Sequence, residues 1–167
     1  MNKGTPPEGS MLVYRIVHKN FSDNLYASGL KGRWNSTGNK VIYAAESIPL
    51  AFLENMVRRQ GVGFNNDFKI MIVEIPDELS ITSIEVSELK EGWRDFKDYS
   101  FCQLLGDKWY TDSKTPLLKV PSAILQECYN YVINTEHRGS QKIKLIDTTE
   151  LVPDERIEEI LKRYRNR

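Results

Sequence analysis

Three residues in the first third of the chain have side chains that could do chemistry together: Arg33, Tyr43 and Glu54. Arg33 lies in the glycine-rich segment 28–40, where a guanidinium and free backbone N–H groups can bind phosphate oxygens. Tyr43 offers an aromatic face that attracts a cationic ring. Glu54 offers a carboxylate that can stabilise a developing positive charge. These residue types suit a site that binds an anion and stabilises a cation.

Each of the three also has an ordinary structural explanation, and spacing alone leaves both explanations open. A loop arginine is usually solvated, and a strand tyrosine usually belongs to the core with its hydroxyl at the rim. A helical glutamate beside an apolar stripe usually pairs with a neighbour, and Arg58 is available four residues later.

Other kinds of chemistry lack a motif. The chain has no G-x-G-x-x-G, no G-x-x-x-x-G-K-[ST], no G-x-S-x-G and no H-E-x-x-H sequence. Its two cysteines and two histidines, Cys102, Cys128, His18 and His137, show no ligand-pair spacing. We therefore expect no metal site, and we expect the cysteines to be small reduced thiols of a cytoplasmic protein.

Composition sets the class of protein. The chain has 167 residues, 40% of them hydrophobic, which fits one domain with a single core. The formal net charge is zero, which argues against direct nucleic-acid binding through many phosphate contacts. No apolar run approaches the ~20 residues that span a bilayer, and no signal peptide is recognisable. We expect residues 1–10 to be a disordered leader or an expression remnant, and residues 11–167 to be the domain.

The patterning predicts elements in an irregular order. A helix should begin after Ser47 and end at Gly61, with Leu50, Leu53, Met56 and Val57 as its apolar stripe. Further helices are expected over 98–112, with Leu104 on the buried stripe, and over 154–165, with Ile160 on its stripe. Strands are expected over 11–17, 41–44, 68–75, 81–86, 117–120, 129–133 and 143–146. This order predicts an α+β fold, a single domain with a mixed sheet and flanking helices.

Several motifs, in order, resemble the RES-domain family. Gly32-Arg33-Trp34-Asn35, Gly38, the run Val41 to Ser47 and Ala51-Phe52-Leu53-Glu54 are similar to its N-terminal signature. Leu105 to Trp109 and Val120 to Ala123 resemble its middle motifs. Asn134-Thr135-Glu136-His137 resembles its N-P-x-H turn, with threonine in the place of proline, and Asp154 to Ile157 resembles its closing D-x-R-[IL].

The resemblance implies a fold like that of ADP-ribosyltransferases and a toxin that degrades NAD⁺. It also implies growth arrest unless the toxin is neutralised by a helix-turn-helix antitoxin of the Xre type, with which a larger oligomer could form. The arginine, glutamate and serine that name the family fall on Arg33, Glu54 and Ser122. NAD⁺ would be the substrate, and no cofactor is expected.

Cleavage of the bond between nicotinamide and ribose gives each residue a task. Positive charge develops on the ribose, and nicotinamide leaves as a neutral base, so no strong general acid is needed. We expect Arg33 to bind the diphosphate, with Arg15 as a second anchor, Tyr43 to stack on nicotinamide, and Glu54 to stabilise the ribose cation.

Ser122 could bond a phosphate or ribose oxygen, or only its local backbone. Asn134 and His137 could line the rim, although a structural role in a turn is favoured. Two other functions stay open: transfer of ADP-ribose to a protein, and a module that only binds its antitoxin.

Overall fold

The computed structural model describes residues 5–59 and 67–166. Its strands are β1 (Ser10–His18), β2 (Val41–Ala45), β3 (Phe68–Pro76), β4 (Ile81–Ser83), β5 (Leu117–Pro121), β6 (Tyr129–Asn134) and β7 (Lys144–Glu150). The α-helices are α1 (Ile48–Arg58), α2 (Ser100–Asp112) and α3 (Glu155–Arg165), and short 3₁₀ helices are η1 (Lys19–Phe21), η2 (Val86–Glu88) and η3 (Arg138–Lys142). No helix among the described residues is long and apolar enough to cross a membrane.

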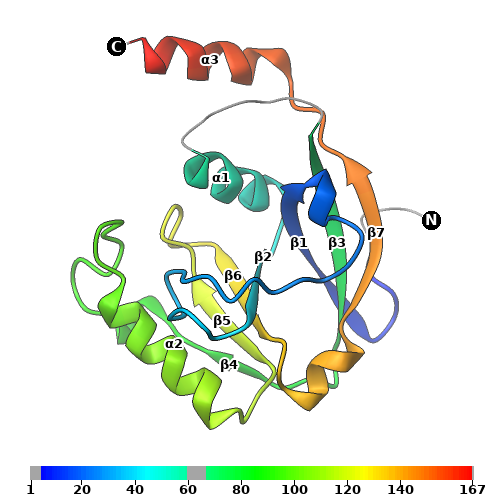
Figure 1. The fold of residues 1–167 in the computed structure, drawn as a ribbon, viewed down its shortest axis with the longest axis vertical. Coiled ribbons are helices and arrows are strands. Elements are labelled where there is room, and N and C mark those ends of the chain that lie inside the picture. The colour runs from blue at the N-terminus through cyan, green and yellow to red at the C-terminus, as the bar shows by residue number, and fades with distance from the viewer. Residues whose placement is uncertain (1–4, 60–66, 167) are drawn as a thin grey trace.

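The strands form one mixed sheet in the order β4-β5-β6-β2-β1-β3-β7, which confirms the predicted α+β domain. All neighbours are antiparallel except β4 and β5, which are parallel. β1 and β2 share the single register pair Tyr14↔Ala45, whereas β1 and β3 are paired from Ser10↔Pro76 to His18↔Phe68. The sheet is therefore almost divided into two halves, β4-β5-β6-β2 and β1-β3-β7, which diverge in Figure 1.

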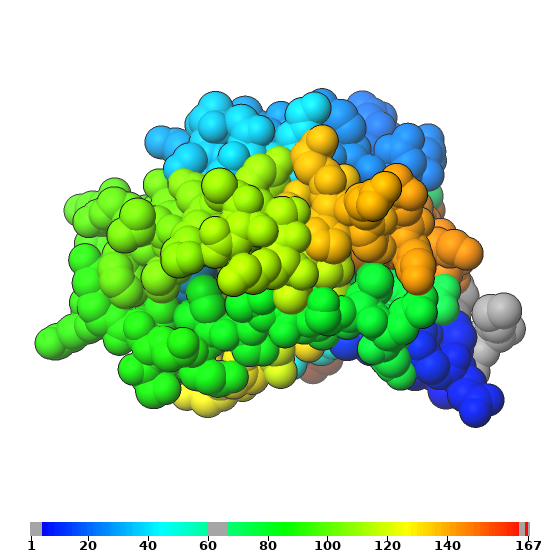
Figure 2. All heavy atoms as spheres, turned by 90° about the horizontal axis from the view of Figure 1, so that it is seen from below, coloured from blue at the N-terminus to red at the C-terminus, as the bar shows by residue number. Residues whose placement is uncertain are grey.

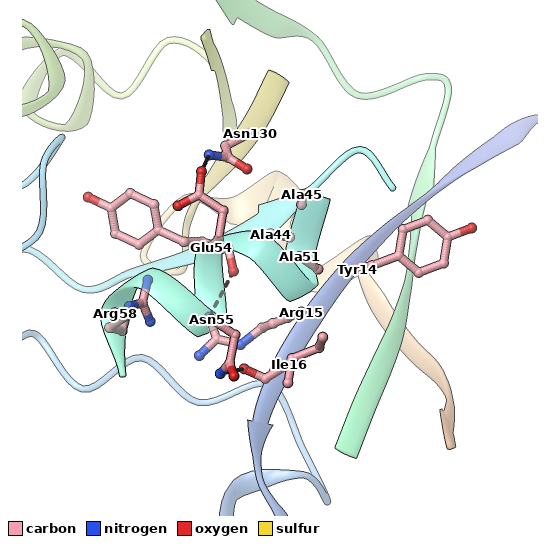
Figure 3. A pocket seen from close by; sticks show the side chains of 11 residues that line it. Tyr14, Arg15, Ile16, Ala44, Ala45, Ala51, Glu54, Asn55, Arg58 and Asn130 are labelled. Carbon is pink, nitrogen blue, oxygen red and sulfur yellow. Dashed lines mark hydrogen bonds between the residues drawn. The ribbon is translucent and has the colours of Figure 1, made fainter. Parts of the chain in front are cut away.

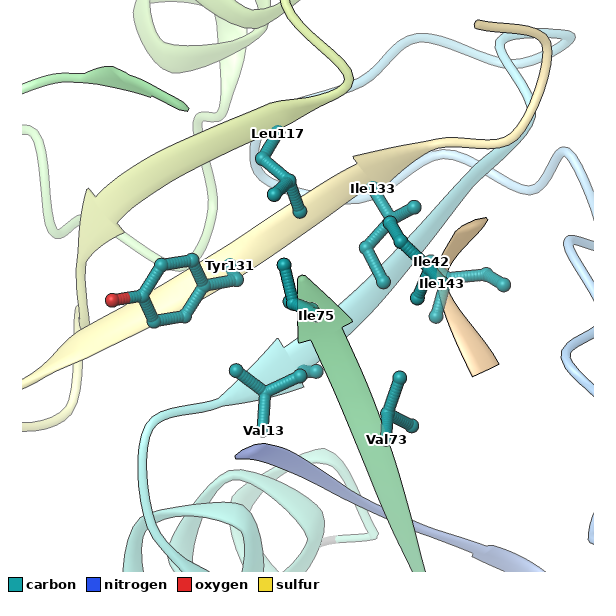
Figure 4. Packing of buried hydrophobic residues seen from close by; sticks show 9 residues of the cluster. Val13, Ile42, Val73, Ile75, Leu117, Tyr131, Ile133 and Ile143 are labelled. Carbon is teal, nitrogen blue, oxygen red and sulfur yellow. The ribbon is translucent and has the colours of Figure 1, made fainter. Parts of the chain in front are cut away.

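The main core lies between these two halves. Figure 4 shows Val73 and Ile75 of β3 facing side chains such as Leu117 of β5 and Ile133 of β6. Valine, leucine and isoleucine contribute roughly 1.5–3 kcal/mol each when fully buried. Burial across the division thus holds the halves together where backbone hydrogen bonds are few.

The helices cover the outer faces of the halves. α1 packs Leu50 and Ala51 against Ile16 and Ile72, on the side of β1 and β3. α2 packs Cys102 and Trp109 over the other half, in a cluster that also contains the two buried tryptophans Trp34 and Trp93 and the strand residues Leu118, Val120 and Val132. α3 lies beyond α1 at the opposite end of the molecule from α2 (Figure 1).

The loop that carries Arg33 runs along α2, as Figure 2 shows from below. Asp107 of α2 accepts hydrogen bonds from the backbone N–H of Ser36 at 2.9 Å and from Asn39 at 2.7 Å. A Cβ placed on Gly106 would lie 1.8 Å from the carbonyl oxygen of Trp34, so only glycine permits this contact between helix and loop. The loop is therefore a rigid attachment to α2.

Several predicted details are wrong. Only Ile81–Ser83 of the expected strand 81–86 is a strand, and η2 replaces its end. Val57 is 58% exposed because α1 turns Leu50, Ala51 and Asn55 inward. Leu104 is 70% exposed because the glycine of α2 faces the loop. Ile160 of α3 is 65% exposed.

Two predicted boundaries fall partly outside the described residues. The predicted helix end at Gly61 lies outside the described residues, and the described helix α1 ends at Arg58. The first four residues of the expected leader also lie outside, and Ser10 is already part of β1.

Candidate active site

A pocket opens where β1 and β2 separate, next to α1 (Figure 3). Both halves of the sheet and the helix contribute to its wall. Residues from three parts of the sequence meet there: 14–16, 43–58 and 130. The lining residues are Tyr14, Arg15, Ile16, Tyr43, Ala44, Ala45, Ala51, Glu54, Asn55, Arg58 and Asn130. The structure thus brings together three of the predicted site residues, Arg15, Tyr43 and Glu54.

Glu54 is held from two sides. Its helix begins where Ser47 accepts a hydrogen bond from the backbone N–H of Leu50, as predicted. Oε1 of Glu54 accepts hydrogen bonds from Ser122 Oγ at 2.8 Å and from Asn130 Nδ2 at 2.6 Å. Within residues 5–59 and 67–166, Oε2 has no hydrogen-bond partner. One carboxylate oxygen is therefore fixed and the other is free for a ligand.

Ser122 lies behind this carboxylate and outside the pocket lining. Its side chain is completely buried, and its hydroxyl donates to Glu54 while accepting from the backbone N–H groups of Ile124 at 3.1 Å and Leu125 at 3.3 Å. The proton of the hydroxyl is used by Glu54. The hydrogen bonds from Ile124 and Leu125 are the local backbone contacts that the sequence left open as one of two roles, and the bond to Glu54 orients the carboxylate. Contact of Ser122 with a phosphate or ribose oxygen stays a prediction.

The pocket also carries two cations, Arg15 and Arg58. Arg15 is partly buried, and its Nη1 donates to the backbone oxygen of Tyr43 at 3.0 Å. Burial, followed by the nearby charge of Arg58, lowers the pKa of Arg15 to about 10. Neither arginine forms an ion pair with another described residue. The two guanidinium groups thus give the pocket positive charge that no ion pair with another described residue neutralises.

The alternative pairing of Glu54 with Arg58 is not formed in the part of the chain that the structure describes. Asn130 and Ser122 bind Oε1 of the glutamate instead, from the other half of the sheet. This leaves the charge of Arg58 available at the pocket.

Tyr43 presents its ring to the pocket and uses its hydroxyl elsewhere. The hydroxyl donates to Asn35 Oδ1 at 2.6 Å and accepts from the backbone N–H of Trp34 at 3.0 Å. Burial is the main cause that raises the pKa of Tyr43 above its usual value. The tyrosine therefore stays neutral and joins the loop 28–40 to the pocket wall.

Arg33 does not line the pocket. Its Nη1 donates to the backbone oxygens of Trp93 at 2.7 Å and Asp95 at 3.3 Å, and its Nη2 donates to that of Arg94 at 3.3 Å. The guanidinium also lies 4.5 Å from the centre of the Tyr99 ring. The structure does not bring Arg33 to Glu54, and its role as diphosphate anchor stays a prediction.

Asn134 and His137 lie at the far end of β6. Asn134 lies four positions after Asn130, which is roughly 13 Å along a strand. Asn134 is buried and accepts from the backbone N–H of Glu136, and His137 Nδ1 accepts from that of Gly139. These contacts fit the structural role in a turn that sequence reasoning favoured.

Sequence reasoning missed four lining residues with polar side chains: Tyr14, Asn55, Arg58 and Asn130. Asn55 is buried in α1 and donates to the backbone oxygen of Ile16 at 3.3 Å, which joins the helix to β1. Asn130 is a polar residue between two tyrosines of a strand, and this was the one local indication available. Its contact with Glu54 depends on the strand order, which no local pattern encodes.

Comparison with known proteins places the sequence in a family. The model of the RES-domain family matches residues 12–154. Toxin Res of Pseudomonas putida KT2440 is 31% identical over 151 residues, which cover 88% of this chain and 99% of that protein. The Prs ADP-ribosylating toxin of Sphingobium sp. YBL2 is 35% identical over 129 residues, covering 74% of this chain and 80% of the relative.

A second protein named Toxin Res, from Yersinia enterocolitica, is 28% identical over 135 residues. The matched region runs from β1 to the residue that caps α3, so it includes every residue of the pocket. The chain belongs to the RES-domain family.

Proposed function

We propose that the chain binds NAD⁺ in this pocket and breaks the bond between nicotinamide and ribose. The observation that carries the proposal is the carboxylate of Glu54, with Oε1 held by Ser122 and Asn130 and Oε2 without a partner in the described residues. A preorganised negative charge is what an oxocarbenium-like ribose requires. By analogy with other preorganised groups, Glu54 would lower the barrier by roughly 2.7–4 kcal/mol.

The remaining pocket residues fit the rest of the substrate. Arg15 and Arg58 offer two positive charges for a diphosphate, and a guanidinium can bind phosphate oxygens through two parallel hydrogen bonds. The ring of Tyr43 can stack on nicotinamide, whose positive charge favours an aromatic face. The leaving nicotinamide is neutral, so the reaction needs no general acid in the pocket.

Water or phosphate is the acceptor of ADP-ribose in the first form of this proposal. A protein acceptor is the second candidate, and one observation favours it: a relative with 35% identity is named an ADP-ribosylating toxin. Both forms use the same carboxylate and differ only in which nucleophile reaches C1 of the ribose.

Loss of NAD⁺ would explain toxicity. We propose that the protein arrests growth when it is produced alone, and that a helix-turn-helix antitoxin of the Xre type neutralises it. The family membership and the relatives named Toxin Res support this part of the proposal.

Nicotinamide release tests the proposal. Purified protein should release nicotinamide from NAD⁺, and Glu54→Gln should abolish most of this release because the charge is lost and the shape is kept. Glu91→Gln, at an exposed position away from the pocket, is the matched control and should behave as wild type. Equal rates for wild type and Glu54→Gln would falsify the catalytic assignment.

The same reaction run with adenine-labelled NAD⁺ separates the acceptors. Label in free ADP-ribose indicates water, and label in a phosphorylated product that forms only with added phosphate indicates phosphorolysis. Label that remains on protein after denaturation indicates transfer to a protein.

A further inference from the structure

The segment 93–95 makes hydrogen bonds with two parts of the molecule: Arg33 in the loop 28–40, and the turn that follows Ser122. It lies before α2, and its backbone oxygens accept the three hydrogen bonds of Arg33. The side chain of Arg94, in the middle of the segment, reaches away from Arg33 to the turn after Ser122. Its Nε donates to the backbone oxygen of Ala123 at 2.7 Å, and its Nη2 donates to that of Ile124 at 2.9 Å.

The turn that Arg94 contacts is the turn that carries Ser122. Two of its backbone N–H groups, those of Ile124 and Leu125, donate to Ser122 Oγ. Ser122 Oγ in turn donates to Oε1 of Glu54. A continuous series of hydrogen bonds therefore runs from the guanidinium of Arg33 through the segment 93–95, Arg94 and the turn to the carboxylate in the pocket.

Arg33 and Arg94 make different contacts in this series of hydrogen bonds. Arg33 binds carbonyl groups on one side of the segment and stacks on Tyr99, so it fixes where the segment lies. Arg94 binds two consecutive carbonyl groups, an arrangement that suits the planar fork of a guanidinium and not the single charge of a lysine.

We infer that Arg94 is a positioning residue for Glu54, which acts by holding the 122–125 turn, and that Arg33 supports it by holding Arg94. This inference rests on the proposed function for its kinetic consequence. It gives Arg33 a task that does not require contact with the substrate. It also names Arg94, which none of the sequence motifs contains.

Steady-state kinetics of Arg94→Ala and Arg94→Lys test the inference. Both variants should lower kcat for nicotinamide release while KM for NAD⁺ stays near that of wild type, because the pocket cations are untouched. Misplacing a catalytic group can lower the rate by up to about a hundredfold. The lysine variant should resemble the alanine variant, since it keeps the charge and loses the two-carbonyl contact. Arg163→Lys, at an exposed site on α3, is the matched control.

A double variant identifies the route. If Arg94 acts through the turn, Arg94→Ala should lower kcat much less in a Ser122→Ala background than in wild type, because the two residues act in series. Fully additive losses, a wild-type kcat in Arg94→Ala, or a change confined to KM would each overturn the inference.

Amide hydrogen exchange gives a readout that does not depend on turnover. Exchange at Ile124 and Leu125 should be faster in Arg94→Ala than in wild type or Arg163→Lys, and unchanged exchange would overturn the inference. If wild-type protein released no nicotinamide, the proposed function would fail while this measurement still decided whether Arg94 holds the turn.

Discussion

Arg15 is a cation in the pocket wall that lacks a counter-ion among the described residues. Burial of a charge without an ion-pair partner costs free energy of folding, and a bound anion would offset this cost. The lowered pKa of Arg15, caused mainly by burial, expresses the same unfavourable desolvation.

Arg15→Met should therefore separate binding from stability. The variant keeps the length of the side chain and removes the charge. We expect weaker NAD⁺ binding, measured by titration calorimetry on protein that also carries Glu54→Gln, and a melting temperature equal to or above that of the parent. Lys31→Met, at an exposed position outside the pocket, is the control for a lost positive charge. A lower melting temperature with unchanged affinity would show that Arg15 is structural.

The pKa of Arg15 also predicts a pH dependence. Its value in the folded protein, about 10, lies below the ordinary value, so folding disfavours the charged form. This destabilisation is present at neutral pH and is relieved as pH rises through about 10. Diphosphate binding needs the charged form, so KM should be constant near neutral pH and rise as pH approaches 10. A pH series of KM measures this, and Arg15→Met should not show the rise.

At the residue scale, the sequence predicted the components of the site better than their contacts. Of the predicted set Arg33, Tyr43 and Glu54, the pocket contains Tyr43 and Glu54, together with Arg15, the predicted second anchor. The partners of Glu54 could not be predicted, because Ser122 and Asn130 reach it only through the order of the strands. The contacts of Arg33 with carbonyl groups of the segment 93–95 could not be predicted either, because they too join residues far apart in the sequence.

At the scale of elements, α2 and the loop 28–40 form one unit. Asp107 and Gln103 of α2 bind the loop through its backbone, and Gly106 allows the close approach to Trp34. Tyr43 then joins this unit to the pocket through Asn35. The position of the pocket wall depends on the fit between helix and loop.

Gly106→Ala tests this fit. In an ordinary helix the change is stabilising by roughly 0.5–1 kcal/mol. Here the new methyl group would overlap the carbonyl oxygen of Trp34, and overpacking of this kind destabilises by about 1–3 kcal/mol. We expect a lower midpoint in urea unfolding. Leu104→Ala, at an exposed position of the same helix, should leave the midpoint almost unchanged, and an equal or higher midpoint for Gly106→Ala would contradict the close contact.

The elements themselves were largely predictable because their patterns are local. Alternation and β-branched residues marked β1, β3 and β6, and Ser47 marked the start of α1. The inward faces of the helices were predicted less well. α1 buries the polar Asn55 against β1, and α2 buries a glycine against the loop. Hydrophobicity alone therefore placed Val57 and Leu104 wrongly on the buried faces, although Leu50 and Trp109 of the same predicted stripes are buried.

At the scale of the whole molecule, the pocket lies between two sheet halves joined by one register pair of strands. A ligand that contacts both halves should stabilise the fold, because it binds the folded state only. NAD⁺ at a hundredfold excess over its Kd should add about 2.7 kcal/mol to the free energy of unfolding. For a domain of this size that is a rise of several degrees in melting temperature.

Thermal unfolding of Glu54→Gln with and without NAD⁺ measures this effect without turnover. The protein that carries Arg15→Met in addition should show little or no rise, because diphosphate binding is lost. A rise of equal size in both proteins would place the ligand elsewhere.

The interleaved order of the strands has a consequence for inheritance. β1, β3 and β7 belong to one half, while β2, β4, β5 and β6 belong to the other, so the chain passes repeatedly between the two. A single genetic crossover between two relatives, at any point from the end of β2 to the start of β6, would give each half a mixture of parental strands. Glu54 and the Ser122 and Asn130 side chains that hold it would be inherited apart by any exchange between them. We expect such a site to diverge by substitution in place, with each change accommodated by partners encoded far away.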